Sequence, residues 1–371
     1  MRERSEGRNL NNMVAVAMSG GVDSSVSAAL LHNQGYRVVG IGLQLVDETE
    51  ANGSARNCCG IGEMEDARRV AEKLGIPFYV LNFKDVFRKH VIDYFTASYL
   101  KGETPNPCVP CNGVVKFDTL LKAAMGFGAG LLATGHYAGV EFDVVNNRYV
   151  LKKGADGSKD QSYFLYSLSQ EQLARAIFPM SDIQKVETRA IARGLRLKVH
   201  DKPESQDICF VGTEGYASYI SRHAGVLFEP GPILDDAGVV LGTHQGLYRY
   251  TIGQRRGLNL SSPKPVYVID IDPVHNSVTV APGDRTRRQQ RVLLGRMNYV
   301  SISKPREPLE VEAVTRYRKP HVPATLAPVD EDSSFALFHY PQEPTAPGQS
   351  VVLYHGDTVL CGGIVRRNNI A

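Results

Sequence analysis

Apolar and polar positions follow different patterns in the two halves of this chain. In the first half, short apolar runs of the kind that form buried strands occupy residues 14–17, 37–45, 78–83 and 131–133. Segments with helical periodicity lie between or after these runs, ending at residue 34 and spanning residues 63–74, 84–100 and 116–125. Because strands that alternate with helices pair in parallel, this pattern predicts a doubly wound α/β sheet.

The second half has a mostly β pattern. After about residue 215, short alternating strands such as 266–271 and 277–281 are separated by Pro, Gly, Asn and Asp. We therefore predict four parts, which are a loose tail over residues 1–12, an α/β domain over 13–215, a small β-rich domain over 216–284 and a C-terminal β-barrel over 285–371.

The bulk composition is that of a globular protein. The chain has 371 residues, of which 43% are hydrophobic and 22% are charged, and it contains no apolar run of about eighteen residues that could cross a membrane. Its first residues are polar and lack the apolar region of a signal peptide. Six cysteines are too few for a disulfide scaffold. We therefore expect a cytoplasmic protein without a membrane partner.

Positive charge is concentrated in one later stretch. The formal net charge is only +3, yet residues 285–319 hold ten basic and three acidic side chains. Such a surplus favours a polyanionic partner, and a solvated strand face is an equal alternative. The cluster from Arg285 to Arg291 indicates no more specific role.

The segment after the first apolar run carries the most specific chemistry. It reads Ser-Gly-Gly-Val-Asp-Ser-Ser over residues 19–25 and opens the first helix. Adjacent glycines let backbone N–H groups approach an anion, and Ser24 and Ser25 add hydroxyl donors at a helix N-terminus. An ordinary P-loop would need a Lys after the glycines, and this segment has none. The segment predicts a cradle for pyrophosphate, against the alternative of a plain Gly-Gly turn capped by Ser.

Cysteines are the second group of candidate functional residues. Cys108 and Cys111 lie in the proline-rich loop Thr-Pro-Asn-Pro-Cys-Val-Pro-Cys-Asn, residues 104–112, before a helix, where a thiol tends to have a lowered pKa. Cys209 lies far along the chain in Asp-Ile-Cys-Phe. Spacing alone leaves open whether Cys209 meets Cys111 or is an inert buried residue. A zinc site lacks further ligands, whereas three cysteines could hold an iron–sulfur cluster.

Several motifs together resemble one known family. Ser-Gly-Gly-Val-Asp-Ser-Ser matches the signature of the PP-loop ATP pyrophosphatases, whose domain is an adenine nucleotide alpha-hydrolase-like parallel sheet. With the motifs that follow it in order, it resembles the tRNA-specific 2-thiouridylases over nearly the whole chain. These motifs are the cysteine loop 104–112, Thr-Gly-His-Tyr at 134–137, Lys-Asp-Gln-Ser-Tyr-Phe-Leu at 159–165, Asp-Ile-Cys-Phe at 207–210, Gly-Gln-Arg-Arg-Gly-Leu at 253–258 and Arg-Tyr at 316–317.

The resemblance implies a reaction that uses both groups of residues. ATP would adenylate O2 of uridine 34, the wobble base of certain tRNAs, and a sulfur nucleophile would then attack C2 and expel AMP. Cys209 would carry that sulfur as a persulfide delivered by a cysteine desulfurase or sulfur relay protein, and Cys111 would be the partner thiol. Family members have either Asp or Cys at the position of Cys108, so an iron–sulfur cluster on Cys108, Cys111 and Cys209 is an alternative route.

The resemblance also implies the binding residues, position by position. ATP, with Mg²⁺ reached through Asp23, would contact Ala17, Met18, Ser19, Gly20, Gly21, Val22, Asp23, Ser24, Leu43 and Gly135. The tRNA anticodon stem-loop would contact Asn106, Pro107, Cys108, Lys159, Asp160, Gln161, Arg316 and Tyr317.

Two other functions compete with this interpretation. Another adenylating synthetase of the PP-loop class would share the nucleotide loop but would need no cysteine pair. An RNA-binding module that has lost catalysis would not need an intact nucleotide loop. The coincidence of the loop with both cysteine sites favours the thiolation reaction.

Overall fold

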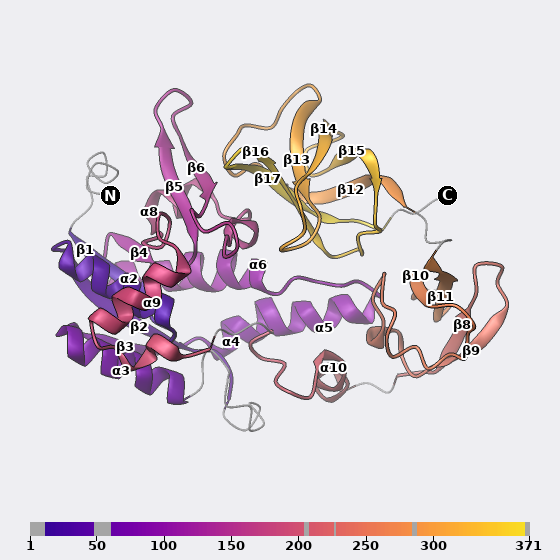
Figure 1. The fold of residues 1–371 in the computed structure, drawn as a ribbon, viewed down its shortest axis with the longest axis horizontal. Helices are drawn as coiled ribbons and strands as arrows, with labels where there is room; N and C mark the ends of the chain where they lie inside the picture. The colour runs from indigo at the N-terminus through magenta and orange to yellow at the C-terminus, as the bar shows by residue number, and fades with distance from the viewer. Residues whose placement is uncertain (1–11, 48–60, 204–207, 226–227, 284–287, 368–371) are drawn as a thin grey trace.

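The structure is a computed structural model that describes residues 12–47, 61–203, 208–225, 228–283 and 288–367. Its first part contains a five-stranded parallel sheet with the order β3-β2-β1-β4-β7 (Figure 1). The strands are β1 (Met13–Ala17), β2 (Arg37–Gln44), β3 (Phe78–Asn82), β4 (Leu131–Ala133) and β7 (Ala176–Ile177). The four strands expected from the apolar runs are confirmed, and the short edge strand β7 was not expected.

Helices cover both faces of this sheet. The alternation of side chains along β1 explains the two layers, because Val14 and Val16 join one hydrophobic core and Ala15 joins the other. The first core also contains side chains of α2 (Val22–Asn33), α3 (Ile61–Leu74) and α9 (Lys185–Gly194). The second core contains side chains of the helices that lead to and follow the cysteine loop. The sheet is therefore doubly wound, as predicted.

The two helical stretches near the cysteines contain π-helical segments. The stretch expected over residues 84–100 consists of α4 (Lys84–Phe87), a π-helical segment (Arg88–Ile92) and α5 (Asp93–Leu100). The next begins with α6 (Cys108–Pro110), continues as a π-helical segment (Cys111–Leu120) and ends with α7 (Leu121–Gly126). The sequence predicted this second helix from residue 116, so the structure starts it earlier and places Cys108 and Cys111 in its first turns.

The remaining short elements connect the sheet to the later domains. The other helices are α8 (Gln170–Arg175), α10 (Tyr216–Ala224) and the 3₁₀ segments Ser162–Phe164, Lys198–Asp201 and Leu247–Arg249. The middle part has a four-stranded sheet ordered β10-β11-β8-β9. Its strands are β8 (Gly231–Leu234), β9 (Val240–His244), β10 (Val266–Asp272) and β11 (Ser277–Pro282). This confirms the β-rich middle part.

The C-terminal part is a closed barrel. Its strands follow the order β12-β15-β14-β13-β16-β17, and β12 pairs with β17 to close it. The strands are β12 (Gln289–Asn298), β13 (Leu309–Val314), β14 (Val322–Pro328), β15 (Ser334–Gln342), β16 (Ser350–His355) and β17 (Thr358–Val365). The predicted C-terminal β-barrel is thus confirmed.

A hairpin of the first part extends the barrel sheet. Strands β5 (Ala138–Asp143) and β6 (Arg148–Lys153) follow the turn after β4, and β6 pairs antiparallel with β17. The hairpin projects beside the barrel in Figure 1. The sequence analysis did not predict it. It makes one continuous sheet out of segments that are about two hundred residues apart in the chain.

Within the described residues, none of the helices has the length and apolar character needed to span a membrane. Residues 1–11 of the predicted tail and residues 284–287, which include part of the basic cluster, lie outside the described residues, so the predictions made for them stay predictions.

Candidate active site

The glycine loop joins β1 to α2. Gly21 is the N-cap of α2 with extended backbone angles (φ −89°, ψ 164°), and no side-chain cap of the described residues satisfies this helix end. Gly20 has φ +70°, and a Cβ there would overlap the carbonyl oxygen of Glu63. Both properties require glycine at position 20. The loop therefore presents helix N–H groups toward the carboxyl end of the sheet, where an anion is stabilised.

The serines of the loop have different surroundings. The Ser24 hydroxyl accepts a hydrogen bond from the Ser19 N–H (3.2 Å) and also lies 3.2 Å from the Gly21 carbonyl, to which it donates. Ser25 is fully buried and its hydroxyl donates to the same carbonyl at 2.8 Å. The Ser25 hydroxyl thus stabilises the first turn of α2, and its expected contact with phosphate stays a prediction.

Two predicted nucleotide contacts lie at or just beyond the carboxyl ends of the strands that flank β1. Leu43 is buried near the end of β2. Gly135 is in the turn after β4, and a Cβ there would lie 2.8 Å from the Ser24 backbone nitrogen. Because β2, β1 and β4 are neighbours in a parallel sheet, their carboxyl ends meet at one edge. The structure brings all the predicted ATP residues to that edge.

Asp23 is held by residues that the sequence analysis did not identify. The Lys185 ammonium donates to both Asp23 carboxylate oxygens, at 2.7 and 2.8 Å. The Tyr137 hydroxyl donates to one of these oxygens at 2.8 Å and lies 2.9 Å from the Thr188 hydroxyl. The Lys185 side chain is only 10% exposed. This places a buried ammonium beside the nucleotide loop, although the loop sequence itself has no Lys.

A second lysine also reaches the loop. The Lys202 ammonium donates to the Gly20 carbonyl oxygen (3.3 Å) and to the Asp66 carboxylate (2.9 Å). Lys185 and Lys202 follow the loop by more than 150 residues. Only long-range folding brings them there, so no local pattern in the sequence could have identified them.

His136, in the same turn as Gly135, is buried. Its Nδ1 lies 2.7 Å from the Thr134 hydroxyl oxygen. Burial, and to a smaller extent the positive charge of Lys116, holds the pKa of His136 well below its usual range. His136 is therefore neutral at physiological pH and acts as a polar but uncharged neighbour of the loop.

We expect His136 to make the protein less stable in mild acid. Below about pH 6.5 the unfolded chain binds a proton on this side chain that the folded protein does not bind, which favours unfolding. His136→Gln should remove up to about 1.4 kcal/mol per pH unit of this dependence. Urea unfolding between pH 6.5 and 5 measures it, with the exposed His355→Gln as control. Identical pH slopes for wild type and His136→Gln would contradict the prediction.

The cysteine loop lies where the three parts of the chain meet. The Thr104 N–H donates to the Pro347 carbonyl (2.7 Å), and the Gln349 amide donates to the Thr104 carbonyl (2.9 Å). The Cys108 N–H donates to the Asn106 side chain at 3.1 Å. Barrel residues therefore fix the start of the loop, and the Asn106 side chain fixes the backbone at Cys108.

Cys111 and Cys209 pack against the same hydrophobic core. Both are partly buried, whereas Cys108 is exposed. The neighbour of Cys209, Phe210, is buried, and its ring lies 5.2 Å from that of Phe95 and 5.3 Å from that of Tyr219. Phe210 thereby anchors the short segment that carries Cys209. Two cysteines from distant segments thus share one side of the first domain.

The described cysteines do not form a ready metal centre. Across the described ranges, no group of three or more His, Cys, Asp or Glu side chains could hold a metal ion. Cys108, Cys111 and Cys209 therefore do not provide a preformed three-thiolate set for an iron–sulfur cluster. Both Asp23 oxygens accept hydrogen bonds from Lys185, and the part that Mg²⁺ takes through Asp23 stays a prediction.

Predicted RNA contacts from three segments converge on one aromatic pair, Tyr163 and Phe164. The Tyr317 ring centroid lies 4.4 Å from that of Phe164 and 6.1 Å from that of Tyr163. The Asn106 side chain hydrogen-bonds the Tyr163 hydroxyl, and the positive charge of Arg316 acts on the same group. The segments brought together are 106–108, 159–161 and 316–317.

In the segment 159–161, two side chains form hydrogen bonds within the protein. The Gln161 amide oxygen accepts from the Tyr137 N–H (3.1 Å), and the Gln161 N–H donates to the Tyr137 carbonyl (2.8 Å). Asp160 accepts from the Gly154 N–H (3.0 Å) and the Ser162 hydroxyl (2.8 Å), while burial raises its pKa. Both residues shape the segment, and their contact with RNA stays a prediction.

Comparison with known proteins agrees with this arrangement. Residues 12–213 match the tRNA methyl transferase HUP domain, residues 217–282 the tRNA methyl transferase PRC-barrel domain and residues 289–365 the aminomethyltransferase beta-barrel domain. The chain is 45% identical over 360 residues to the tRNA-specific 2-thiouridylase MnmA of Clostridioides difficile, which covers 97% of this chain and 99% of that protein. It is 46% identical over 361 residues to that of Heliobacterium modesticaldum, covering 97% and 94%. The chain therefore belongs to the tRNA-specific 2-thiouridylase family.

Proposed function

We propose that this protein uses ATP to convert uridine 34 of tRNA into 2-thiouridine. The observation that carries the proposal is the placement of a nucleotide loop and two cysteines on one domain, beside a cluster of predicted RNA contacts. Family membership supports the reaction class. An amide-forming synthetase would not need the cysteines, and a module that only binds RNA would not need the glycine loop. We place the activity in the cytoplasm, where substrate tRNA is available.

The first step is adenylation of the base. The N–H groups at the start of α2 and the ammonium of Lys185 stabilise negative charge on the phosphates of ATP. The uridine O2 attacks the α-phosphorus, the bond between the α- and β-phosphates breaks, and pyrophosphate leaves. Mg²⁺ enters with ATP as part of the substrate. The base C2 now carries AMP, a good leaving group.

The second step is sulfur transfer. The terminal sulfur of a Cys209 persulfide bonds to C2, the bond between C2 and the adenylated oxygen breaks, and AMP leaves. The Cys111 thiolate then attacks the Cys209 sulfur, so the persulfide S–S bond breaks and its electron pair stays on the base sulfur. The products are 2-thiouridine and a Cys111–Cys209 disulfide, which an external thiol reduces. A desulfurase or relay protein must then reload Cys209.

A tRNA-dependent nucleotide assay tests the proposal. ATP labelled on its α-phosphate is incubated with the protein and a tRNA transcript that has U34, or a matched transcript that has C34. We expect AMP formation with the U34 transcript only, because C34 presents a different pyrimidine edge. Mass spectrometry of the digested RNA should show 2-thiouridine once a persulfide donor is added. Equal AMP formation with both transcripts, or without RNA, would refute the proposed substrate.

A further inference from the structure

A rigid turn in the middle domain presents two adjacent arginines. The turn runs from Gly253 to Gly257, which have φ +84° and +76°, and we call it the arginine turn. The Gln254 side chain connects its two ends, because its oxygen accepts from the Thr251 N–H (2.9 Å) and its amide donates to the Arg256 carbonyl (3.0 Å). The Gln254 backbone carbonyl also accepts from the Val268 N–H of β10 at 2.9 Å. Side chain and strand together fix the loop.

The two arginines of this turn have no ion-pair partner among the residues that the structure describes. Arg255 and Arg256 are both exposed, and within the described ranges no carboxylate forms an ion pair with either. Other exposed basic residues do have such partners, for example Arg222 with Glu214 and Lys319 with Glu343. An arginine pair on a rigid turn, with no ion-pair partner among the described residues, is suited to bind phosphate, because little backbone freedom is lost on binding.

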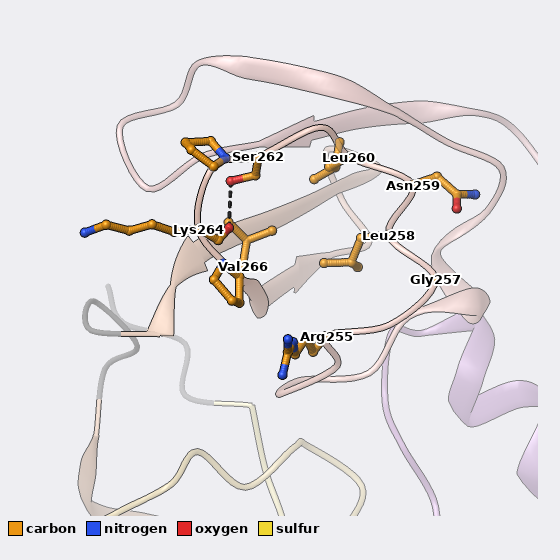
Figure 2. Close-up of a pocket in the computed structure, with 10 residues that line it drawn as sticks. Arg255, Gly257, Leu258, Asn259, Leu260, Ser262, Lys264 and Val266 are labelled. Atoms are coloured by element: carbon orange, nitrogen blue, oxygen red, sulfur yellow. Dashed lines mark hydrogen bonds between the residues drawn. The ribbon is translucent and has the colours of Figure 1, made fainter.

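A cavity lies next to the turn. Its volume is about 400 Å³, and its lining contains Arg255 and Lys264 but no acidic residue. Figure 2 shows Leu258, Leu260 and Val266 in its middle, with Arg255 and Lys264 extending in different directions from it. An apolar floor with cations at the rim is suited to a nucleotide rather than to a free inorganic anion.

The arginine turn is connected directly to the cysteine loop. The Thr251 and Thr104 hydroxyl oxygens lie 3.4 Å apart. The guanidinium of Arg367 donates to the Ile271 carbonyl in β10 and to the Gly102 carbonyl (3.3 Å). Thr104 precedes Cys108 by four residues, a reach of at most about 14 Å of backbone. The turn therefore has a fixed position beside the loop that meets the reacting base.

We infer that the arginine turn and its cavity bind the sugar–phosphate backbone of the tRNA substrate, on nucleotides that flank the reacting uridine. The inference rests on the proposed function, which supplies the RNA. Contacts with phosphates position an RNA without reading its sequence. The middle domain would thus bind RNA in addition to the first domain and the barrel. It would determine the affinity for tRNA rather than the choice of the base that reacts.

The test measures the salt dependence of RNA binding by the full chain. In Arg255→Ala/Arg256→Ala, removal of two phosphate contacts should make the slope of log Kd against log salt shallower by about 1.4 to 1.8. The KM for tRNA should rise while kcat at saturating tRNA and the Kd for ATP stay unchanged. Arg255→Lys/Arg256→Lys keeps the charge and should keep most of the slope.

Matched controls separate this inference from the proposed function. Arg68→Ala/Arg69→Ala removes the same adjacent pair from exposed positions of α3, at the opposite end of the molecule (Figure 1), and should leave the slope unchanged. Arg316→Ala serves as the positive control. A shallower slope for Arg316→Ala with an unchanged slope for the turn variant overturns the inference alone. Absence of tRNA binding or of tRNA-dependent AMP formation in the wild type overturns the proposed function instead.

Discussion

Serine in place of Cys209 is expected to abolish 2-thiouridine formation and to leave tRNA-dependent AMP formation measurable. A hydroxyl cannot carry a persulfide sulfur, so the second step should fall by about 10³-fold or more. The first step should continue, because adenylation uses the loop between β1 and α2 and not the segment anchored by Phe210. Mass spectrometry of digested tRNA measures the thiolated base, and release of labelled AMP measures adenylation in the same reaction.

The cysteine at position 361 provides a matched control. It is fully buried in the barrel, and burial raises the pKa of its thiol far above the usual range, so it should take no part in sulfur chemistry. Cys361→Ala should thiolate normally per folded molecule. Undiminished thiolation by Cys209→Ser would remove Cys209 from the mechanism, whereas loss of both AMP and thiolation would show that Cys209 is needed for adenylation.

Methionine in place of Lys185 is expected to lower the rate of AMP formation by about 10²- to 10³-fold, the effect of losing one preorganised charge at a reacting centre. The Lys185 ammonium lies against both Asp23 oxygens at the start of α2. We expect the same ammonium to bind a phosphate of ATP, because the loop itself contains no lysine that could do so. Methionine keeps most of the length of the side chain and removes the charge together with its hydrogen-bond donors. Single-turnover AMP formation at saturating ATP measures the effect.

The Lys185 variant needs a check on folding, because the Asp23 carboxylate then loses its cationic partner in a partly buried site and keeps only the hydrogen bond from Tyr137 among the described residues. Binding of tRNA without ATP supplies it, since the predicted RNA contacts lie elsewhere. Lys73→Met is the control, because that exposed lysine of α3 bonds only the Arg196 carbonyl among the described residues. AMP formation by a folded Lys185→Met at the wild-type rate would show that the Lys185–Asp23 pair is purely structural.

Local sequence patterns predicted the parts of the site that local structure creates. The glycines at 20 and 21 lie where a buried strand passes into a helix, and parallel pairing brings the ends of β2 and β4 beside them. Each of these facts depends on a few neighbouring residues. The sequence-based motif at 104–112 located the cysteine loop for the same reason, although the start of its helix was placed too late.

The parts that the sequence did not predict depend on distant contacts. Lys185 reaches Asp23 over 162 positions, and nothing near Lys185 in the sequence marks it as a neighbour of a glycine loop. Strand β7 has only two residues, too few for a periodic pattern. The β5–β6 hairpin looks like an ordinary pair of short strands, and only the folded barrel provides the strand with which β6 pairs.

The pairing of β6 with β17 limits how far the chain can be treated as separable modules. Leu151 is fully buried in the same core as Val359, its partner across that pairing, and the Ser301 side chain accepts from the Leu151 N–H at 2.8 Å. A fragment that ended before the barrel would retain the glycine loop and both active cysteines but would expose the edge of β6 to other chains, a template for aggregation. The α/β domain and the barrel therefore depend on each other structurally.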